Sequence, residues 1–175
     1  LIGVGEQVLI SRPTLFGPEP DEIKNEVYKT LHYRLMAHTA EDLCEMYMDE
    51  FDMERCGHDD VKHGFAIYYQ DQKPDIDLVE LERKVNEDIA KDMPVAYADE
   101  THVRIGDTVH LCGGPRTHVT TTGRVEGFCL CHEIIYDNQR NRYLLIGLVG
   151  ENSEERIHKL KHSAQQTDMM GPFIY

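Results

Sequence analysis

The sequence predicts an α+β protein with an acidic helical region, then a small five-stranded β-barrel and a short C-terminal helix. Residues 1–100 carry 10 Lys+Arg against 24 Asp+Glu, and they contain three stretches with apolar residues at helical spacing. The charge is almost balanced in residues 101–150, with 5 against 4. There the pattern changes to short β-branched and aromatic runs separated by turn residues. We therefore divide the chain into residues 1–98, 99–150 and 151–175.

The acidic region is expected to contain three helices after a short strand over residues 4–10. The first begins near Asp21 and repeats an apolar residue every four positions as far as Leu35. A capping-box pattern at Thr39 predicts a second helix, so the two would form a hairpin with its turn at His38–Thr39. The third runs from Pro74 to about Asp92. We expect the acidic face of the second helix to be solvated; it carries Glu41, Glu45, Asp49, Asp52 and Glu54.

The expected strands of the central segment are residues 102–105, 108–112, 117–125, 128–136 and 142–149. Glycines at positions 106, 123, 127 and 147 permit the sharp bends of a small barrel. With Gly-Asp before one strand and Gly-Arg-Val later, this arrangement resembles an SH3-like barrel. The resemblance implies a docking or assembly module and carries no activity with it.

The last segment begins with an amphipathic helix capped by Asn152 or Ser153. The apolar tail over residues 168–175 either packs back onto the core or serves as an exposed docking segment.

Two groups of Cys and His residues are candidate metal ligands, for zinc or iron. The first is Cys56, His58 and His63, whose thiolate and imidazole groups lie within eight residues of one another. The second is Cys112, Cys129 and Cys131, of which the last two share one strand face. Each group has a structural alternative: a polar loop between helices for the first, and buried, packed thiols for the second.

No phosphate-binding loop, dinucleotide-binding motif or nucleophile elbow occurs in the sequence, which favours a non-catalytic role. The concentrated acidity disfavours nucleic-acid binding and favours a protein partner with a basic surface, or self-association. We expect an interaction or assembly module that docks through its acidic helices and needs no cofactor. The alternatives are a zinc or iron protein or enzyme, and an acidic mimic of nucleic acid that acts as an inhibitor.

Five cysteines without a secretion signal predict reduced thiols and a cytoplasmic location. The sequence contains no apolar run long enough to cross a membrane, so no membrane association is expected.

Overall fold

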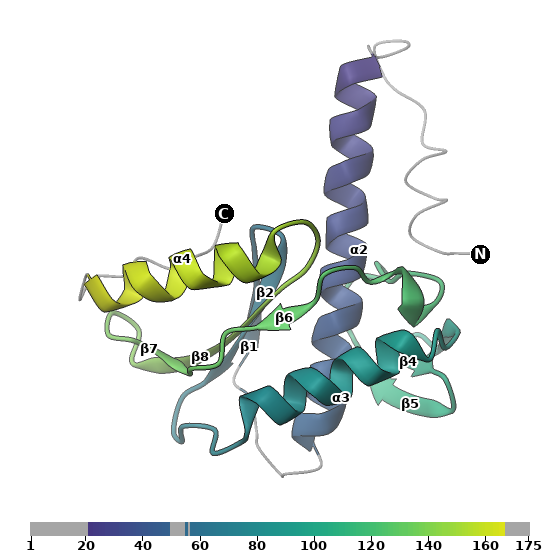
Figure 1. The fold of residues 1–175 in the computed structure, drawn as a ribbon. Helices are drawn as coiled ribbons and strands as arrows, with labels where there is room; N and C mark the ends of the chain where they lie inside the picture. Colours follow the sequence, from purple (N-terminus) through teal and green to yellow (C-terminus); the bar gives the residue numbers. More distant parts are fainter. Residues whose placement is uncertain (1–20, 50–54, 56, 167–175) are drawn as a thin grey trace.

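The structure is a computed structural model that describes residues 21–49, 55 and 57–166 of the 175-residue chain. The described residues form three α-helices and two antiparallel sheets (Figure 1). This confirms the α+β class. The expected strand over residues 4–10 and the apolar tail over residues 168–175 lie outside the described residues.

The larger sheet has five strands, and β2 and β8 form its centre. Its strands are β1 (Gly57–Val61), β2 (Gly64–Tyr69), β6 (Cys129–Leu130), β7 (Ile135–Asp137) and β8 (Arg142–Leu148). The order is β1-β2-β8-β6, and β7 also pairs with β8. Every residue of β2 is buried because both faces of the sheet are covered. Gly147 lies opposite Phe65, and a Cβ at residue 147 would meet the Phe65 ring at 2.4 Å.

The two faces of this sheet pack against different helices. Phe65, Ile67 and Leu145 belong to the larger core, together with residues of helices α2 (Asp21–Asp49) and α3 (Leu78–Ala90). The intervening residues of β2 and β8 join a smaller core covered by α4 (Ser153–Gln166). The alternation of side chains along a strand therefore produces a three-layer arrangement.

Helix α2 is continuous, so the predicted helical hairpin with a turn at His38–Thr39 is wrong. The Thr39 hydroxyl donates to the Leu35 carbonyl one turn earlier, at 2.8 Å. The same hydroxyl accepts a hydrogen bond from the backbone N–H of Val119, at 3.1 Å. A threonine that satisfies its hydroxyl in these two ways stays inside a helix instead of capping one.

The second sheet is small, and the expected closed barrel is not found among the described residues. It contains β3 (Val95–Asp99), β4 (His102–Ile105) and β5 (Thr108–Leu111), in that order. The strands of the central segment are thus divided between two sheets, and β8 pairs with β2 instead of closing a barrel with β4 and β5. The division of the chain at residues 98 and 150 stays a prediction.

Two of the five expected strands have a different structure. Residues 117–125 form a loop and a short 3₁₀ turn, η1 (Thr122–Arg124). Polar groups of this stretch bond to the helices: the Thr122 hydroxyl donates to the Asp88 carbonyl at the end of α3, at 2.8 Å. Residues 128–136 form two separate strands, β6 and β7, with a break between them.

The third and the C-terminal helices are present, but α3 begins at Leu78 and not at the predicted Pro74. Asp77 caps α3 by accepting a hydrogen bond from the Glu80 N–H at 3.1 Å, and Leu78, Leu81 and Val85 are buried. None of the described helices combines the length and apolar character needed to cross a membrane.

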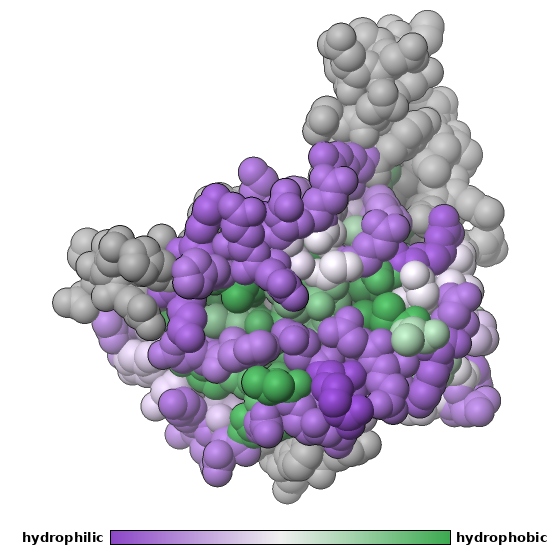
Figure 2. Space-filling view, viewed as in Figure 1, coloured by the Kyte–Doolittle hydropathy of each residue, from purple (hydrophilic) through white to green (hydrophobic). Residues whose placement is uncertain are grey.

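Hydrophilic side chains predominate on the face shown in Figure 2, around a central band of hydrophobic residues.

Candidate metal centre

One face of α2 presents a row of ionisable side chains to the protein interior. His38, Asp42 and Glu45 are four and three residues apart, so they share a helix face. Their side chains are 12%, 3% and 4% exposed, respectively. Glu41, on the same face, is also buried, so the expectation that Glu41 and Glu45 are solvated is wrong. Docking on a basic partner through an acidic surface stays a prediction. Glu41 and Glu45 cannot belong to that surface, because they are buried.

The opposite wall comes from β5 and the loop that follows it. In β5, His110 is buried between the exposed Val109 and Leu111, as strand alternation requires. Cys112 comes two residues later, and the loop then places the buried His118 beside α2. The hydrogen bond between Val119 and Thr39 ties this loop to the helix. The wall therefore consists of residues about 70 positions away from α2 in the chain.

His38, Asp42, Cys112 and His118 lie close enough together to bind one metal ion. One ligand atom from each lies within 4.8 Å of the ligand atoms of the other three. Cys112 Sγ is 3.5 Å from His38 Nε2 and 3.9 Å from His118 Nε2. Asp42 Oδ2 is 3.8 Å from His38 Nε2. Donor atoms around a tetrahedral zinc ion, with bonds of about 2.0–2.3 Å, lie about 3.3–3.8 Å apart.

A fourth pair of donor atoms in this group lies closer together than the other three pairs. His118 Nε2 and Asp42 Oδ2 are 2.6 Å apart, the length of a charge-assisted hydrogen bond. An ion between these two atoms would replace the hydrogen bond and require them to separate by about 1 Å. The three pairs with separations of 3.5, 3.8 and 3.9 Å are already close to the spacing around a bound ion.

Both imidazoles are held from behind by a second polar group. His38 Nδ1 lies 3.3 Å from the Thr117 carbonyl and 3.0 Å from the Thr117 hydroxyl; a proton on Nδ1 that is donated to the carbonyl leaves the Nε2 lone pair facing Cys112. His118 Nδ1 lies 3.0 Å from the Tyr97 hydroxyl. The two imidazole rings stack with centroids 4.1 Å apart. Metal-binding histidines typically have such a partner on the nitrogen that does not face the ion.

The electrostatic environment keeps two of these groups in the form that binds a cation. Burial lowers the pKa of His38, so its imidazole is neutral. For Asp42, burial favours the acid, but the hydrogen bond from His118 and the nearby imidazoles outweigh it, so its pKa is lowered. Burial and the charge of Asp42 raise the pKa of Cys112 to about 12. A metal that bound at Cys112 would therefore release a proton from the thiol.

Further charged groups extend the cluster along α2. His110 Nε2 is 3.2 Å from Glu45 Oε1, and Arg55 Nη1 is 2.9 Å from Glu45 Oε2. Burial lowers the pKa of His110, but the hydrogen bond to Glu45 and the charges around it outweigh burial, so the net pKa is raised. His58 Nδ1 of β1 lies 3.1 Å from Glu41 Oε2. Burial raises the pKa of Glu41, and the hydrogen bond to Glu41 raises the pKa of His58.

The structure separates the six metal ligands that were predicted from the sequence. Cys112 lies in the cluster, and His58 contacts its edge through Glu41. Cys56 lies outside the described residues. Cys129 and Cys131 are buried, and neither belongs to a group that could hold a metal among the described residues. Whether any of the six binds a metal stays a prediction.

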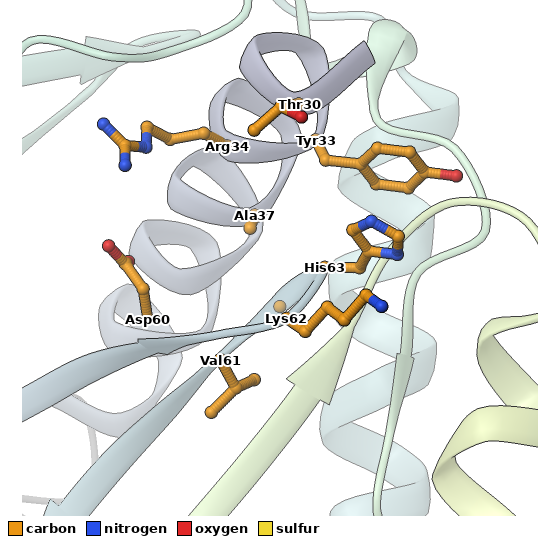
Figure 3. A pocket seen from close by; sticks show the side chains of 9 residues that line it. Thr30, Tyr33, Arg34, Ala37, Asp60, Val61, Lys62 and His63 are labelled. Atoms are coloured by element: carbon orange, nitrogen blue, oxygen red, sulfur yellow. The ribbon is translucent and has the colours of Figure 1, made fainter. Parts of the chain in front are cut away.

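His63 lies at a different place, in the turn between β1 and β2. Its ring stacks on Tyr33 with centroids 3.9 Å apart, beside a cavity of about 300 Å³ that Arg34 and Lys62 also line (Figure 3). Its pKa is lowered by burial and by nearby cations, Arg156 first among them.

Four residues of the cluster were not predicted as ligands from the sequence: His38, Asp42, His110 and His118. Two short sequence patterns contain these ligands: His-x₃-Asp at helical spacing (His38 and Asp42), and His-x-Cys-x₅-His from the end of a strand into the following loop (His110, Cys112 and His118). The first was hidden by the predicted break at His38–Thr39, which would have separated the two ligands. The second was hidden because residues 117–125 were expected to form a strand.

No protein-family model matches the chain, and the search of curated proteins finds no significant match. The function proposed below therefore rests on the geometry of the cluster.

Proposed function

We propose that this protein binds zinc, through His38, Asp42, Cys112 and His118. The observation that carries the proposal is the convergence of four donor side chains, two buried and two partly buried, with separations of 3.5, 3.8 and 3.9 Å between three pairs of their donor atoms. Because α2 contributes two ligands and the β5 loop the other two, the ion ties the long helix to the small sheet. Its role is to hold these two parts together.

The donor set favours zinc over iron. One thiolate, two imidazole nitrogens and one carboxylate oxygen form a mixed tetrahedral set of the kind that zinc accepts. With a thiolate and a carboxylate as ligands, the charge of the ion is balanced inside the protein. The ion therefore offsets the free-energy cost of burying the Asp42 carboxylate.

The same donor set favours a structural ion over a catalytic one. Catalytic zinc typically has three protein ligands and one position open to water, whereas structural zinc has four protein ligands. Four protein donors converge here, and Asp42 and His118 are 2% exposed. The proposal therefore assigns no reaction to this ion.

The test is elemental analysis of the purified protein, followed by replacement of the bound ion with Co²⁺. We expect stoichiometric zinc, and a Co²⁺ derivative with the near-ultraviolet thiolate-to-metal absorption band of a cysteine ligand. The variants Cys112→Ala and His118→Gln should lose this binding.

The matched controls are Cys131→Ala and His132→Gln. Cys131 is a buried cysteine of the other core, and His132 is a histidine whose side chain is 46% exposed. Both controls should bind zinc as the unmodified chain does. Protein that contains neither zinc nor iron, and that takes up no Co²⁺ with a thiolate band, would remove the proposal.

A further inference from the structure

The two carboxylate oxygens of Asp42 face different groups. Oδ2 is 2.6 Å from His118 Nε2 and 3.8 Å from His38 Nε2, inside the zinc site proposed above. Oδ1 points to the other side and lies 3.9 Å from His110 Nε2. A carboxylate that presents one oxygen to each of two donor groups has the arrangement of a bridging ligand between two metal ions.

On the far side of Asp42, a second group of donors converges. Asp42, Glu45 and His110 each offer a ligand atom within 4.8 Å of the other two, and all three residues are buried. His110 Nε2 is 3.2 Å from Glu45 Oε1, so both atoms lie at a separation that one ion can span.

Glu45 is a buried carboxylate whose two oxygens face different groups. Oε2 is paired with Arg55 Nη1 at 2.9 Å, and Oε1 lies 3.2 Å from His110 Nε2. The side chain as a whole is 4% exposed. Two buried carboxylates, Asp42 and Glu45, therefore lie within 4.8 Å of each other, and a cation coordinated by both offsets the cost of burying two like charges together.

His110 is also oriented for coordination. Its other ring nitrogen, Nδ1, lies 3.7 Å from Asp49 Oδ2. In the absence of an ion, Nε2–H donates to Glu45 Oε1; an ion bound at Nε2 would replace this proton while Nδ1 still faces the Asp49 carboxylate. Asp49 is 67% exposed, so this end of the group reaches solvent.

We propose that a second divalent ion binds to Glu45, His110 and Oδ1 of Asp42, with Asp42 bridging it to the zinc ion. This inference rests on the proposed function, because the bridge requires the first ion. The second ion has three protein donors, so water completes its coordination. Its ligands are oxygen and nitrogen atoms only, so it is held less tightly than the thiolate-bound zinc and leaves first on chelation. Arg55, which balances Glu45 in the absence of the ion, has a 36% exposed side chain.

The experiment is a titration of the metal-free full chain with Co²⁺, with bound metal counted by elemental analysis after dialysis. We expect two equivalents: the first develops the thiolate absorption band, and the second adds only weak visible bands. The variants His110→Gln and Glu45→Gln should bind one equivalent, with the thiolate band unchanged. Asp42→Asn should weaken both binding steps, because it removes the shared ligand.

His132→Gln is the control, and circular dichroism of each variant verifies that it folds. One equivalent with a thiolate band in the unmodified chain overturns the second site and leaves the zinc site in place. Two equivalents that persist in both His110→Gln and Glu45→Gln also overturn it. Binding without any thiolate band removes the proposed function itself, so the two failures are distinguishable.

Discussion

Cys112 is a partly buried thiol among polar groups, whereas Cys131 is a fully buried thiol among apolar ones. Cys112 lies among imidazoles and a carboxylate, 3.5 Å from His38 Nε2 and 3.9 Å from His118 Nε2. Cys131 lies in the smaller core, packed with Ala66, Ile146 and their apolar neighbours. The comparison shows that a cysteine becomes a candidate ligand through what the fold places beside it. The closeness of Cys129 and Cys131 in the sequence carried less information than a contact across 74 residues.

The same contrast holds for the two sheets. The five-stranded sheet is stabilised by apolar side chains on both faces. The three-stranded sheet buries Val103 and Ile105 in the larger core, but its strand β5 leaves Val109 and Leu111 exposed and turns His110 inward to a group of charged residues. We infer that the larger sheet is stable without an ion, whereas the attachment of β5 and the loop after it to α2 depends on the ion.

Removal of the metal is expected to have the largest effect. If free zinc is about a thousandfold above its dissociation constant, binding stabilises the folded state by about 4 kcal/mol. For a chain of this length, this corresponds to a fall of about 8–16 °C in melting temperature after chelation. Thermal unfolding followed by circular dichroism, with and without a chelator, measures it. Cys112→Ala should show no zinc-dependent shift, and equal melting temperatures for the loaded and chelated unmodified chain would contradict the prediction.

A cavity in the apolar core should destabilise the protein without affecting the metal. Leu145 is 0% exposed, between the larger sheet and α2. Leu145→Ala should lower the free energy of unfolding by about 3 kcal/mol, through lost burial and the cavity left behind. Urea denaturation at saturating zinc measures this loss, and a Co²⁺ titration of the folded variant should match the unmodified chain. Loss of the thiolate band in the folded variant would show that the two regions are not independent.

The larger part of the fold was predictable from local pattern. Helix α3 has its cap at Asp77 and its apolar residues at helical spacing, so few alternatives exist. The pairing of β2 with β8 was not predictable, because nothing local specifies a partner about 80 residues away. The continuity of α2 was missed because Thr39 has the sequence signature of a cap. Only the position of Val119 shows that its hydroxyl is used inside the helix.

For the metal site, residue types were predictable but their grouping was not. Zinc or iron and the thiol of Cys112 were considered from the sequence. Two of the three partners of Cys112, His38 and Asp42, come from α2, and they share one helix face only because that helix does not break at residue 38. The carboxylates were interpreted as a solvated face because helical spacing alone does not tell which face the rest of the chain will cover.

A change behind the ligands should have an intermediate effect. Tyr97→Phe removes the hydroxyl that lies 3.0 Å from His118 Nδ1 and keeps the ring under the Arg116 guanidinium. Loss of such a partner typically weakens metal binding about 10–100-fold. Competition with a chelator of known affinity measures the change. Tyr136→Phe, an exposed tyrosine that bonds to Asn141, is the control, and an equal affinity for all three proteins would contradict a supporting role for Tyr97.

The smallest effect is expected at Cys131. Cys131→Ala removes one sulfur atom from the smaller core, where its neighbours are apolar, and should cost about 1 kcal/mol of unfolding free energy. Zinc affinity should be unchanged, because no imidazole or carboxylate forms a metal-binding group with this thiol among the described residues. A tenfold loss of zinc affinity in this variant would overturn the distinction between the two cysteines. It would return Cys131 to the set of ligands suggested by sequence spacing. An unchanged affinity, beside complete loss in Cys112→Ala, would show that burial alone does not make a thiol a ligand and that the imidazoles and the carboxylate around Cys112 do.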